Sequence, residues 1–299
     1  LNVVKSEEGS TLTINGGKFT GTYAKGWSYN GVILSAGTTI ITDGEFIQEA
    51  TTPARSYPSV ILAMQVEGYT STITITGGKF TNKKSDWNIF YGWGKASSDN
   101  FEVSGGTFNK SISDGYCADG FIPTKNADGT YGVKAGKYVA QIGSKKYETL
   151  ADAIRLAAKG KTITLLDNVT ENVEIAANKK LTLDLNGCVL RMTGNTRVFY
   201  VYNNATLTIP DSSAAKSGTI TGGMAGDGGG VCIGDNSSEG HLVMTGVSIA
   251  GCATDPSRGG GRGGGVFVFK GSFTMSGTAK ITNCTADWGG GVVVHTRSS

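Results

Sequence analysis

Hydrophobic and polar residues alternate in short stretches along the first third of the chain, and each stretch ends at a glycine corner followed by phenylalanine. The clearest copies are Thr11–Phe19 (TLTINGGKF) and Thr72–Phe80 (TITITGGKF), with weaker ones at Thr39–Phe46 and Asn100–Phe108. Alternation with a period of two is typical of a β-strand that buries one side. Since the phrase returns at intervals of roughly 30 residues, it predicts a β-solenoid.

Short apolar runs lie between these phrases, at Gly31–Ser35, Val60–Met64 and Asn88–Tyr91. Each coil is therefore predicted to contain at least two strands. The glycines are expected at sharp corners, because glycine accepts positive φ values. The phenylalanine after each corner is expected to return to the interior, where its burial contributes about 1.5–3 kcal/mol.

The middle of the chain has a different pattern. Asp128–Tyr131 predicts a hairpin-like turn, and Thr149–Lys159 predicts a helix that ends at Gly160. Thr149 and Asp152 form a capping-box pattern. The apolar stripe of this helix consists of Leu150, Ala153, Ile154 and Ala157. Strands are expected directly afterwards, at 161–166, 173–175 and 181–185.

The last third contains one whole coil with three predicted strands, at Gly263–Phe269, Ser272–Ser276 and Lys280–Cys284. The coil before it begins at Gly228 and is longer. Its extra residues fall at 235–240 and 255–262. Insertions of this kind form loops on one face of a solenoid, which is often the binding face.

The passage YETLADAIRLAAKGKTITLLDNVTENVEIAANKKLTLDLNG resembles the start of right-handed parallel β-helix domains such as those of pectin methylesterases. The resemblance implies that the helix caps the open end of the coil stack. Together with the GGxF phrases, YCADGFIPTKNADGTYGV and the GGGVxV coils, the chain is similar to pectin-lyase-like repeat regions of large adhesin-like surface proteins of anaerobic gut bacteria. This similarity implies a secreted or cell-wall-attached protein.

The fold class expected from these patterns is all-β. It comprises two segments of right-handed parallel β-helix, at residues 1–134 and 135–299, the second with an N-terminal helical cap. The chain starts at Leu1 without a signal peptide, and Gly289–Val294 opens a repeat that is not completed. We therefore expect a mature or excised fragment.

Composition narrows the classes of partner. Charged residues make up 17% of the chain and the net charge is +3, so no basic face for nucleic acid is expected. No apolar run approaches the roughly 20 residues that a membrane helix needs. The combination of 46 glycines with only 5 prolines excludes collagen and Pro-rich disorder, and it fits a chain with many tight turns.

The five cysteines include no CxxC pair, and neither a metal site nor a cofactor is expected. Cys252 and Cys284 each end an Ile-x-x-Cys phrase. This repetition favours a stack of buried thiols on successive coils. A disulfide between them stays open, since neighbouring strands lie about 4.8 Å apart.

No catalytic residues are assigned, because the chain has only His241 and His295 and lacks the motifs of hydrolytic triads, phosphate loops and polygalacturonases. An alternative remains, in which a glycosidase or polysaccharide lyase has its groove on the C-terminal coils. Its candidate acids are Asp227, Asp235, Asp255 and Asp287. Asp255 and Asp287 are expected to meet, because each follows the Ile-x-x-Cys phrase by three residues. A glycosidase needs two carboxyls about 5–9.5 Å apart.

Two aromatic clusters in the first segment are the candidate ligand-binding residues: Trp27 and Tyr29 in one loop, and Trp87, Tyr91 and Trp93 in a later one. Such rings offer flat apolar faces with polar edges, which suit sugars and protein surfaces. The same residues can instead cover the core. The function expected is a non-catalytic adhesin or stalk that contacts glycans or host proteins.

Overall fold

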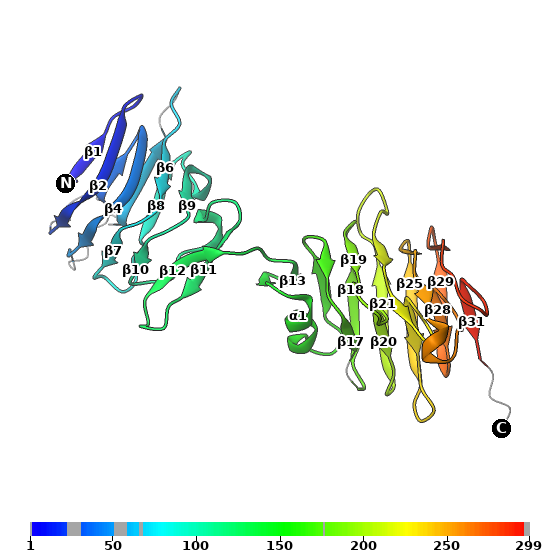
Figure 1. Ribbon diagram of the computed structural model, residues 1–299. Helices are drawn as coiled ribbons and strands as arrows, with labels where there is room; N and C mark the ends of the chain where they lie inside the picture. Colours follow the sequence, from blue (N-terminus) through cyan, green and yellow to red (C-terminus); the bar gives the residue numbers. More distant parts are fainter. Residues whose placement is uncertain (1, 23–30, 51–58, 66–67, 176, 296–299) are drawn as a thin grey trace. The chain divides into compact units, whose positions relative to one another are not determined.

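The structure is a computed structural model that describes residues 2–22, 31–50, 59–65, 68–175 and 177–295. It confirms the prediction of an all-β fold: parallel sheets form a β-solenoid of about nine turns, with one short helix. The chain divides into two compact units, Leu1–Lys137 and Tyr138–Ser299, which are described separately (Figure 1).

The first unit has two parallel faces. One sheet has the strand order β1 (Val4–Ser6), β3 (Gly31–Ser35), β5 (Ser59–Gln65) and β8 (Phe90–Gly94). In the other sheet, two long strands, β2 (Thr11–Gly21) and β4 (Thr38–Gln48), pair side by side with a register shift at the glycine corner. The next coils break at this corner into β6 (Thr72–Ile75) and β7 (Lys79–Asn82), then β9 (Phe101–Val103) and β10 (Thr107–Phe108).

The corners and the phenylalanines behave as the repeated phrase predicts. Gly78 and Gly106 have φ values of +95° and +100°, a region that favours glycine. The rings that follow the corners stack from coil to coil, with centroid separations of 5.2 Å for Phe19–Phe46, 4.9 Å for Phe46–Phe80 and 5.3 Å for Phe80–Phe108. A continuous aromatic column therefore forms the core of this unit, and its last three rings are fully buried.

A hairpin lies at the end of this stack. Strands β11 (Phe121–Lys125) and β12 (Tyr131–Ala135) pair antiparallel, and β12 continues the sheet antiparallel to β10. The predicted turn is held by the Asp128 carboxylate, which accepts hydrogen bonds from the backbone N–H and the hydroxyl of Thr130. Two short 3-10 helices, η1 (Ser98–Asn100) and η2 (Asp114–Tyr116), lie in the preceding loops.

The second unit begins with an antiparallel hairpin, β13 (Ala140–Ile142) and β14 (Lys145–Tyr147), followed by helix α1 (Leu150–Leu156). Three parallel sheets then form the sides of the solenoid. The first contains β15 (Thr162–Leu165), β18 (Lys180–Asp184), β21 (Ala205–Pro210), β25 (Gly240–Thr245) and β29 (Gly271–Ser276). The second contains β16 (Val169–Thr170), β19 (Val189–Arg191), β22 (Thr219–Thr221), β26 (Ser248–Ala250) and β30 (Lys280–Thr282).

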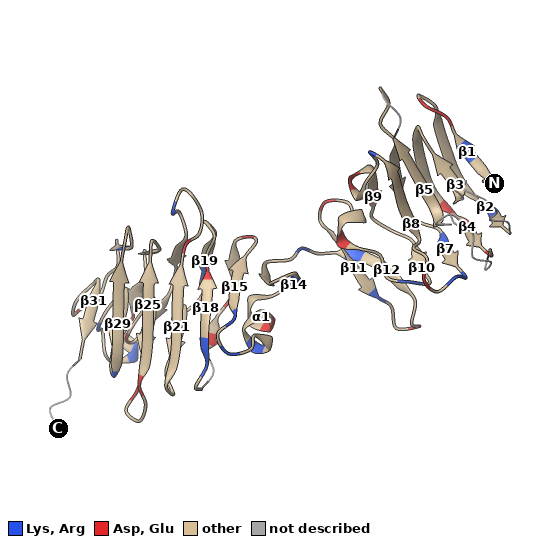
Figure 2. Cartoon of the chain, turned by 180° about the vertical axis from the view of Figure 1, so that it is seen from behind, with Lys and Arg blue, Asp and Glu red and all other residues tan. Residues whose placement is uncertain are grey.

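The third sheet, called here the β17–β31 sheet, contains β17 (Val173–Ile175), β20 (Phe199–Val201), β24 (Val231–Ile233), β28 (Val266–Val268) and β31 (Val292–Val294). A small pair, β23 (Met224–Ala225) and β27 (Ala253–Thr254), lies at a corner, and a 3-10 helix, η3 (Pro256–Arg258), lies in the following loop. In the first sheet, strands β21 and β25 contain no Lys, Arg, Asp or Glu, as Figure 2 shows.

Helix α1 packs against the first strands of this unit, and its four apolar-stripe residues are buried as predicted. Its first turn is capped by the Thr149 hydroxyl and by the Glu171 carboxylate, which accepts hydrogen bonds from the N–H groups of Leu150 and Ala151. The predicted end at Lys159 is wrong, because the helix ends at Leu156. Lys179 from the next coil donates to the carbonyls of the last turn, so these groups need no further helical partners.

Candidate functional site

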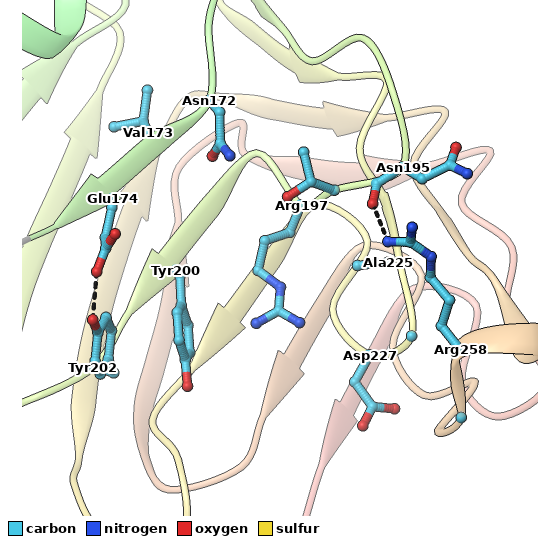
Figure 3. Close-up of a pocket in the computed structure, with 13 residues that line it drawn as sticks. Asn172, Val173, Glu174, Asn195, Arg197, Tyr200, Tyr202, Ala225, Asp227 and Arg258 are labelled. Carbon is cyan, nitrogen blue, oxygen red and sulfur yellow. Dashed lines mark hydrogen bonds between the residues drawn. The ribbon is translucent and has the colours of Figure 1, made fainter.

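A cavity of about 840 Å³ lies on the outer side of the β17–β31 sheet (Figure 3). Its wall is formed by four coils in succession, and most of the side chains in it are polar. The lining residues are Asn172, Val173, Glu174, Asn195, Thr196, Arg197, Tyr200, Tyr202, Ala225, Gly226, Asp227, Arg258 and Gly259. This volume is typical of sites for small molecules and short oligomers.

Strand alternation explains which residues reach the cavity. In β20, Phe199 and Val201 are fully buried in the core, so Tyr200 between them faces outward. The parallel register then aligns Glu174 in β17, Tyr200 in β20 and Cys232 in β24 in one outward row. Successive coils therefore place a carboxylate and an aromatic ring next to each other on the cavity floor.

The Arg197 guanidinium and the rings of Tyr200 and Tyr202 lie side by side on the cavity floor. The rings of Tyr200 and Tyr202 are stacked, with centroids 4.1 Å apart and an interplanar angle of 15°. The Arg197 guanidinium lies 4.8 Å from the centroid of the Tyr200 ring, which is a cation–π contact. The Tyr202 hydroxyl donates a hydrogen bond to the Glu174 carboxylate, as Figure 3 shows. This bond raises the pKa of Tyr202.

Another wall includes Asp227, which directly precedes a GGGV phrase. Asp227, Arg262 and Trp288 occupy corresponding positions in three consecutive coils, joined by bridges between neighbours. The Asp227 carboxylate accepts hydrogen bonds from Nε and Nη2 of Arg262, at 3.0 and 2.7 Å. This bond raises the pKa of Arg262. The guanidinium also lies 4.8 Å from the Phe267 ring, so it is fixed from two sides.

Two of the four charged side chains in the cavity, Arg258 and Asp227, form ion pairs, and a third, Glu174, accepts a hydrogen bond from the Tyr202 hydroxyl. Arg258 pairs with Asp255 at 3.6 Å and donates to the carbonyl of Asn195. Asp227 is held by Arg262. Within the part of the chain that the structure describes, no carboxylate forms an ion pair with Arg197. Figure 3 shows its side chain extending into the space between Tyr200 and Asp227. Arg197 therefore offers guanidinium donors to a bound molecule.

A second cavity, of about 390 Å³, adjoins the first and shares Asn172, Val173 and Glu174 with it. Its other wall is formed by helix α1 and by Lys179. The two cavities together make a groove that runs along the solenoid from the helical cap to the fourth coil of this unit. The capping helix is thus part of the candidate site as well as a cover for the core.

The four aspartates proposed for an enzyme lie in different surroundings. Asp227 lines the cavity, whereas Asp235 and Asp255 accept hydrogen bonds from serines of their own turns. These bonds lower the pKa of both carboxyls. Asp287 is exposed, and its carboxylate lies 2.6 Å from where a Cβ on Gly261 would stand. Its neighbour in the preceding coil is thus Gly261 of the inserted loop.

Of the aromatic residues predicted to bind a ligand, Trp87, Tyr91 and Trp93 are half-buried. Trp27 and Tyr29 lie outside the described residues. In β8, Phe90 is buried, and the half-buried Tyr91 and Trp93 lie on the opposite side of the strand. Trp87 lies in the loop before β8, with the Lys84 ammonium 5.6 Å from its ring centroid. Both proposed roles, ligand contact and core cover, remain compatible with these partly exposed positions.

The cysteines and the two histidines have contacts that are typical of structural positions. All five cysteines are free thiols, and the described residues contain no cluster of three or more His, Cys, Asp or Glu side chains suited to a metal ion. His241 Nδ1 lies 2.9 Å from the Ser272 hydroxyl, and His295 packs 5.3 Å from the Phe269 ring.

Fold and site together define a parallel β-solenoid with a polar lateral groove. Comparisons with protein families, with curated proteins and with solved structures gave no match. Among the described helices, none has the length and apolar character needed to cross a bilayer.

Proposed function

We propose that this chain is a non-catalytic binding module of a secreted or cell-surface bacterial protein, and that it binds a glycan in the groove on the β17–β31 sheet. The observation that carries the proposal is the cavity floor formed by Arg197, Tyr200 and Tyr202. Aromatic rings with polar edges suit sugars, because pyranose rings combine apolar C–H faces with hydroxyl rims.

The charge pattern favours a glycan that carries an acidic group. Arg197 has guanidinium donors directed into the cavity, and a guanidinium matches a carboxylate or sulfate geometrically. The asparagines at the rim, Asn172 and Asn195, add amide donors and acceptors for hydroxyl groups. A sugar acid placed against Tyr202 with its anionic group at Arg197 would use both features.

The alternative, a carbohydrate-active enzyme, is favoured by one observation: Glu174 and Asp227 line the same cavity. Hydrolysis needs one of two carboxyls to be protonated as a general acid. Here both Asp227 oxygens accept hydrogen bonds from Arg262, and Glu174 accepts one from Tyr202. Both carboxylates thus already have protein donors, so binding without turnover agrees better with the contacts.

Trp87, Tyr91 and Trp93 are retained as a proposed second contact surface, on the first unit. This surface would suit glycans or host proteins through its aromatic faces. Lys84 beside Trp87 adds a positive charge at its edge. Two contact surfaces on one chain would raise the overall affinity by multivalency if one polymer reached both.

Binding of the whole chain to a panel of neutral and acidic glycans tests the proposal, with Arg197→Gln as the site variant. Arg191→Gln serves as the matched control, because Arg191 is exposed on β19 and does not line the cavity. We expect an acidic glycan to bind the wild type and the control equally, and the site variant at least tenfold more weakly. Equal binding by all three proteins, or release of shortened products, contradicts the proposal.

A further inference from the structure

Cys252 and Cys284 occupy the same place in consecutive coils. The flanking residues are in register: Ala250 pairs with Thr282, and Ala253 bridges to Thr285. The N–H of Thr285 also donates to the carbonyl of Cys252, at 3.0 Å. The two cysteines are therefore direct neighbours across a parallel pair. Adjacent strands lie about 4.8 Å apart, within the range of roughly 4.4–6.8 Å that disulfides span.

Each thiol lies beside the third glycine of a GGGV phrase. A Cβ on Gly230 would lie 3.3 Å from the Cys252 sulfur, and a Cβ on Gly265 would lie 3.5 Å from the Cys284 sulfur. These glycines hold the same position in the GGGV phrases of consecutive coils. The Cys284 thiol also lies 3.9 Å from the Ile249 carbonyl, so it reaches the coil that carries Cys252. Bond formation therefore requires little movement of the backbone.

From this register and this contact we propose that Cys252 and Cys284 are a covalent modification site, in which a low-molecular-weight disulfide oxidises them to one disulfide bond between coils. The site is independent of the proposed glycan groove. Of the other three thiols, Cys117 belongs to the first unit, Cys232 faces outward from β24, and Cys188 precedes β19. In register, only Cys252 and Cys284 are adjacent among the five.

The exchange begins at Cys284, which is half-buried, whereas Cys252 is fully buried. The neighbouring Cys252 thiol lowers the pKa of Cys284 and so favours its thiolate. The thiolate attacks one sulfur of oxidised glutathione, forms a mixed disulfide and releases one glutathione thiolate. Cys252 then attacks the Cys284 sulfur and releases the second glutathione, which leaves as its thiol with the proton of Cys252. Two protein thiols are oxidised, and one glutathione disulfide is reduced to two thiols.

The bond would join the fourth and fifth coils of the second unit. The fourth coil of the second unit carries Arg262, which holds Asp227, and the fifth carries Trp288 in the same row. A link between these coils would resist fraying of the last described turn, where Trp288 and Val294 are strongly exposed. Stabilisation of this kind acts mainly by restricting the unfolded chain.

Peptide mapping by mass spectrometry tests the site. The whole chain is incubated with oxidised glutathione, alkylated with iodoacetamide and digested with trypsin. Because no Lys or Arg separates Cys232 from Cys252, the experiment uses Cys232→Ser to make the assignment unambiguous. We expect one linked pair, Cys252 with Cys284, and alkylation of Cys117 and Cys188. Cys188→Ser must preserve the link and Cys284→Ser must abolish it.

Hydrogen exchange on the same oxidised and reduced samples gives a readout that needs no variant. We expect slower exchange of the segment 281–295 after oxidation, by at least tenfold, and no change in the first unit. A stable glutathione adduct on Cys284, a link that includes another cysteine, or full alkylation of both residues after oxidation overturns the proposal.

Discussion

Asp227 and Arg262 face each other across consecutive coils, with both carboxylate oxygens bound by one guanidinium at 3.0 and 2.7 Å. Each residue directly precedes a GGGV phrase, so the repeat itself brings them together. The pair fixes one wall of the cavity and engages a carboxylate that would otherwise repel an acidic ligand.

The variant Asp227→Asn distinguishes a binding site from a catalytic site. The change removes a negative charge from the cavity and frees part of the Arg262 guanidinium, so we expect an acidic glycan to bind about two- to tenfold more tightly. If Asp227 were instead a catalytic acid or base, the same variant would abolish turnover. Calorimetric titration together with product analysis distinguishes these results, with exposed Asp119→Asn as the charge-matched control.

The aromatic column predicts where the first unit is most sensitive. Phe80 is fully buried and stacks on Phe46 and Phe108, so Phe80→Ala should lower the free energy of unfolding by about 3–5 kcal/mol. Phe19 is half-buried, and Phe19→Ala should cost clearly less. Urea unfolding followed by tryptophan fluorescence measures both. Equal losses in the two variants would contradict a column that carries the core.

Asp211 makes the second unit sensitive to acid. Burial raises its pKa, but hydrogen bonds from Ser213, Gly218 and Gly187 outweigh burial and hold the pKa below its usual value. The carboxylate therefore stabilises the fold at neutral pH and above about pH 4, and this stability is lost as pH falls through the native pKa.

Asp211→Asn should cost about 1–3 kcal/mol at pH 7, because the side-chain amide cannot accept all three of these backbone bonds. The difference in unfolding free energy between the variant and the wild type should shrink as the pH is lowered from 5 to roughly 2.5. Urea unfolding across this range measures it. A difference that stays constant with pH would show that ionised Asp211 does not stabilise the turn.

Glu171 is expected to hold the helical cap in place. It accepts hydrogen bonds from the N–H groups of Leu150 and Ala151, at 3.0 and 2.9 Å. Glu171→Gln should weaken this contact and destabilise the helix by about 1 kcal/mol, because an amide keeps only one acceptor oxygen and no charge. Hydrogen exchange of residues 150–156 measures the loss. The exposed Glu239→Gln should leave this exchange unchanged.

Much of the fold can be predicted from the sequence because each coil repeats the same pattern of residues. The alternating Thr and Ile positions, the glycine corner and the returning phenylalanine impose the same local structure on each coil, and stacking then fixes the register. The helix end was missed because Lys179, a residue of the following coil, binds the carbonyls of its last turn. Such a tertiary contact leaves no signal in the local pattern.

The cavity was not predicted, although two signals for it exist. The alternation in Val198–Tyr202 places Tyr200 on the outer side of its strand, and alignment of the GGGV phrases places Asp227 beside Arg262. The tryptophans of the first unit are the more conspicuous signal in the sequence, and they indicate a binding surface there instead. The inserted loop at 255–262 also shifts the alignment of the coils, so that Asp287 lies beside Gly261. Counting residues from the Ile-x-x-Cys phrase does not reveal this shift, because the inserted loop follows that phrase.

The most direct test of the account is a crystal structure of the chain with the acidic glycan that binds it most tightly. The account predicts the acidic group of the sugar within hydrogen-bond distance of the Arg197 guanidinium, and a sugar ring against Tyr200 or Tyr202. Glycan bound only at Trp87 and Trp93, or a cleaved sugar between Glu174 and Asp227, would contradict it.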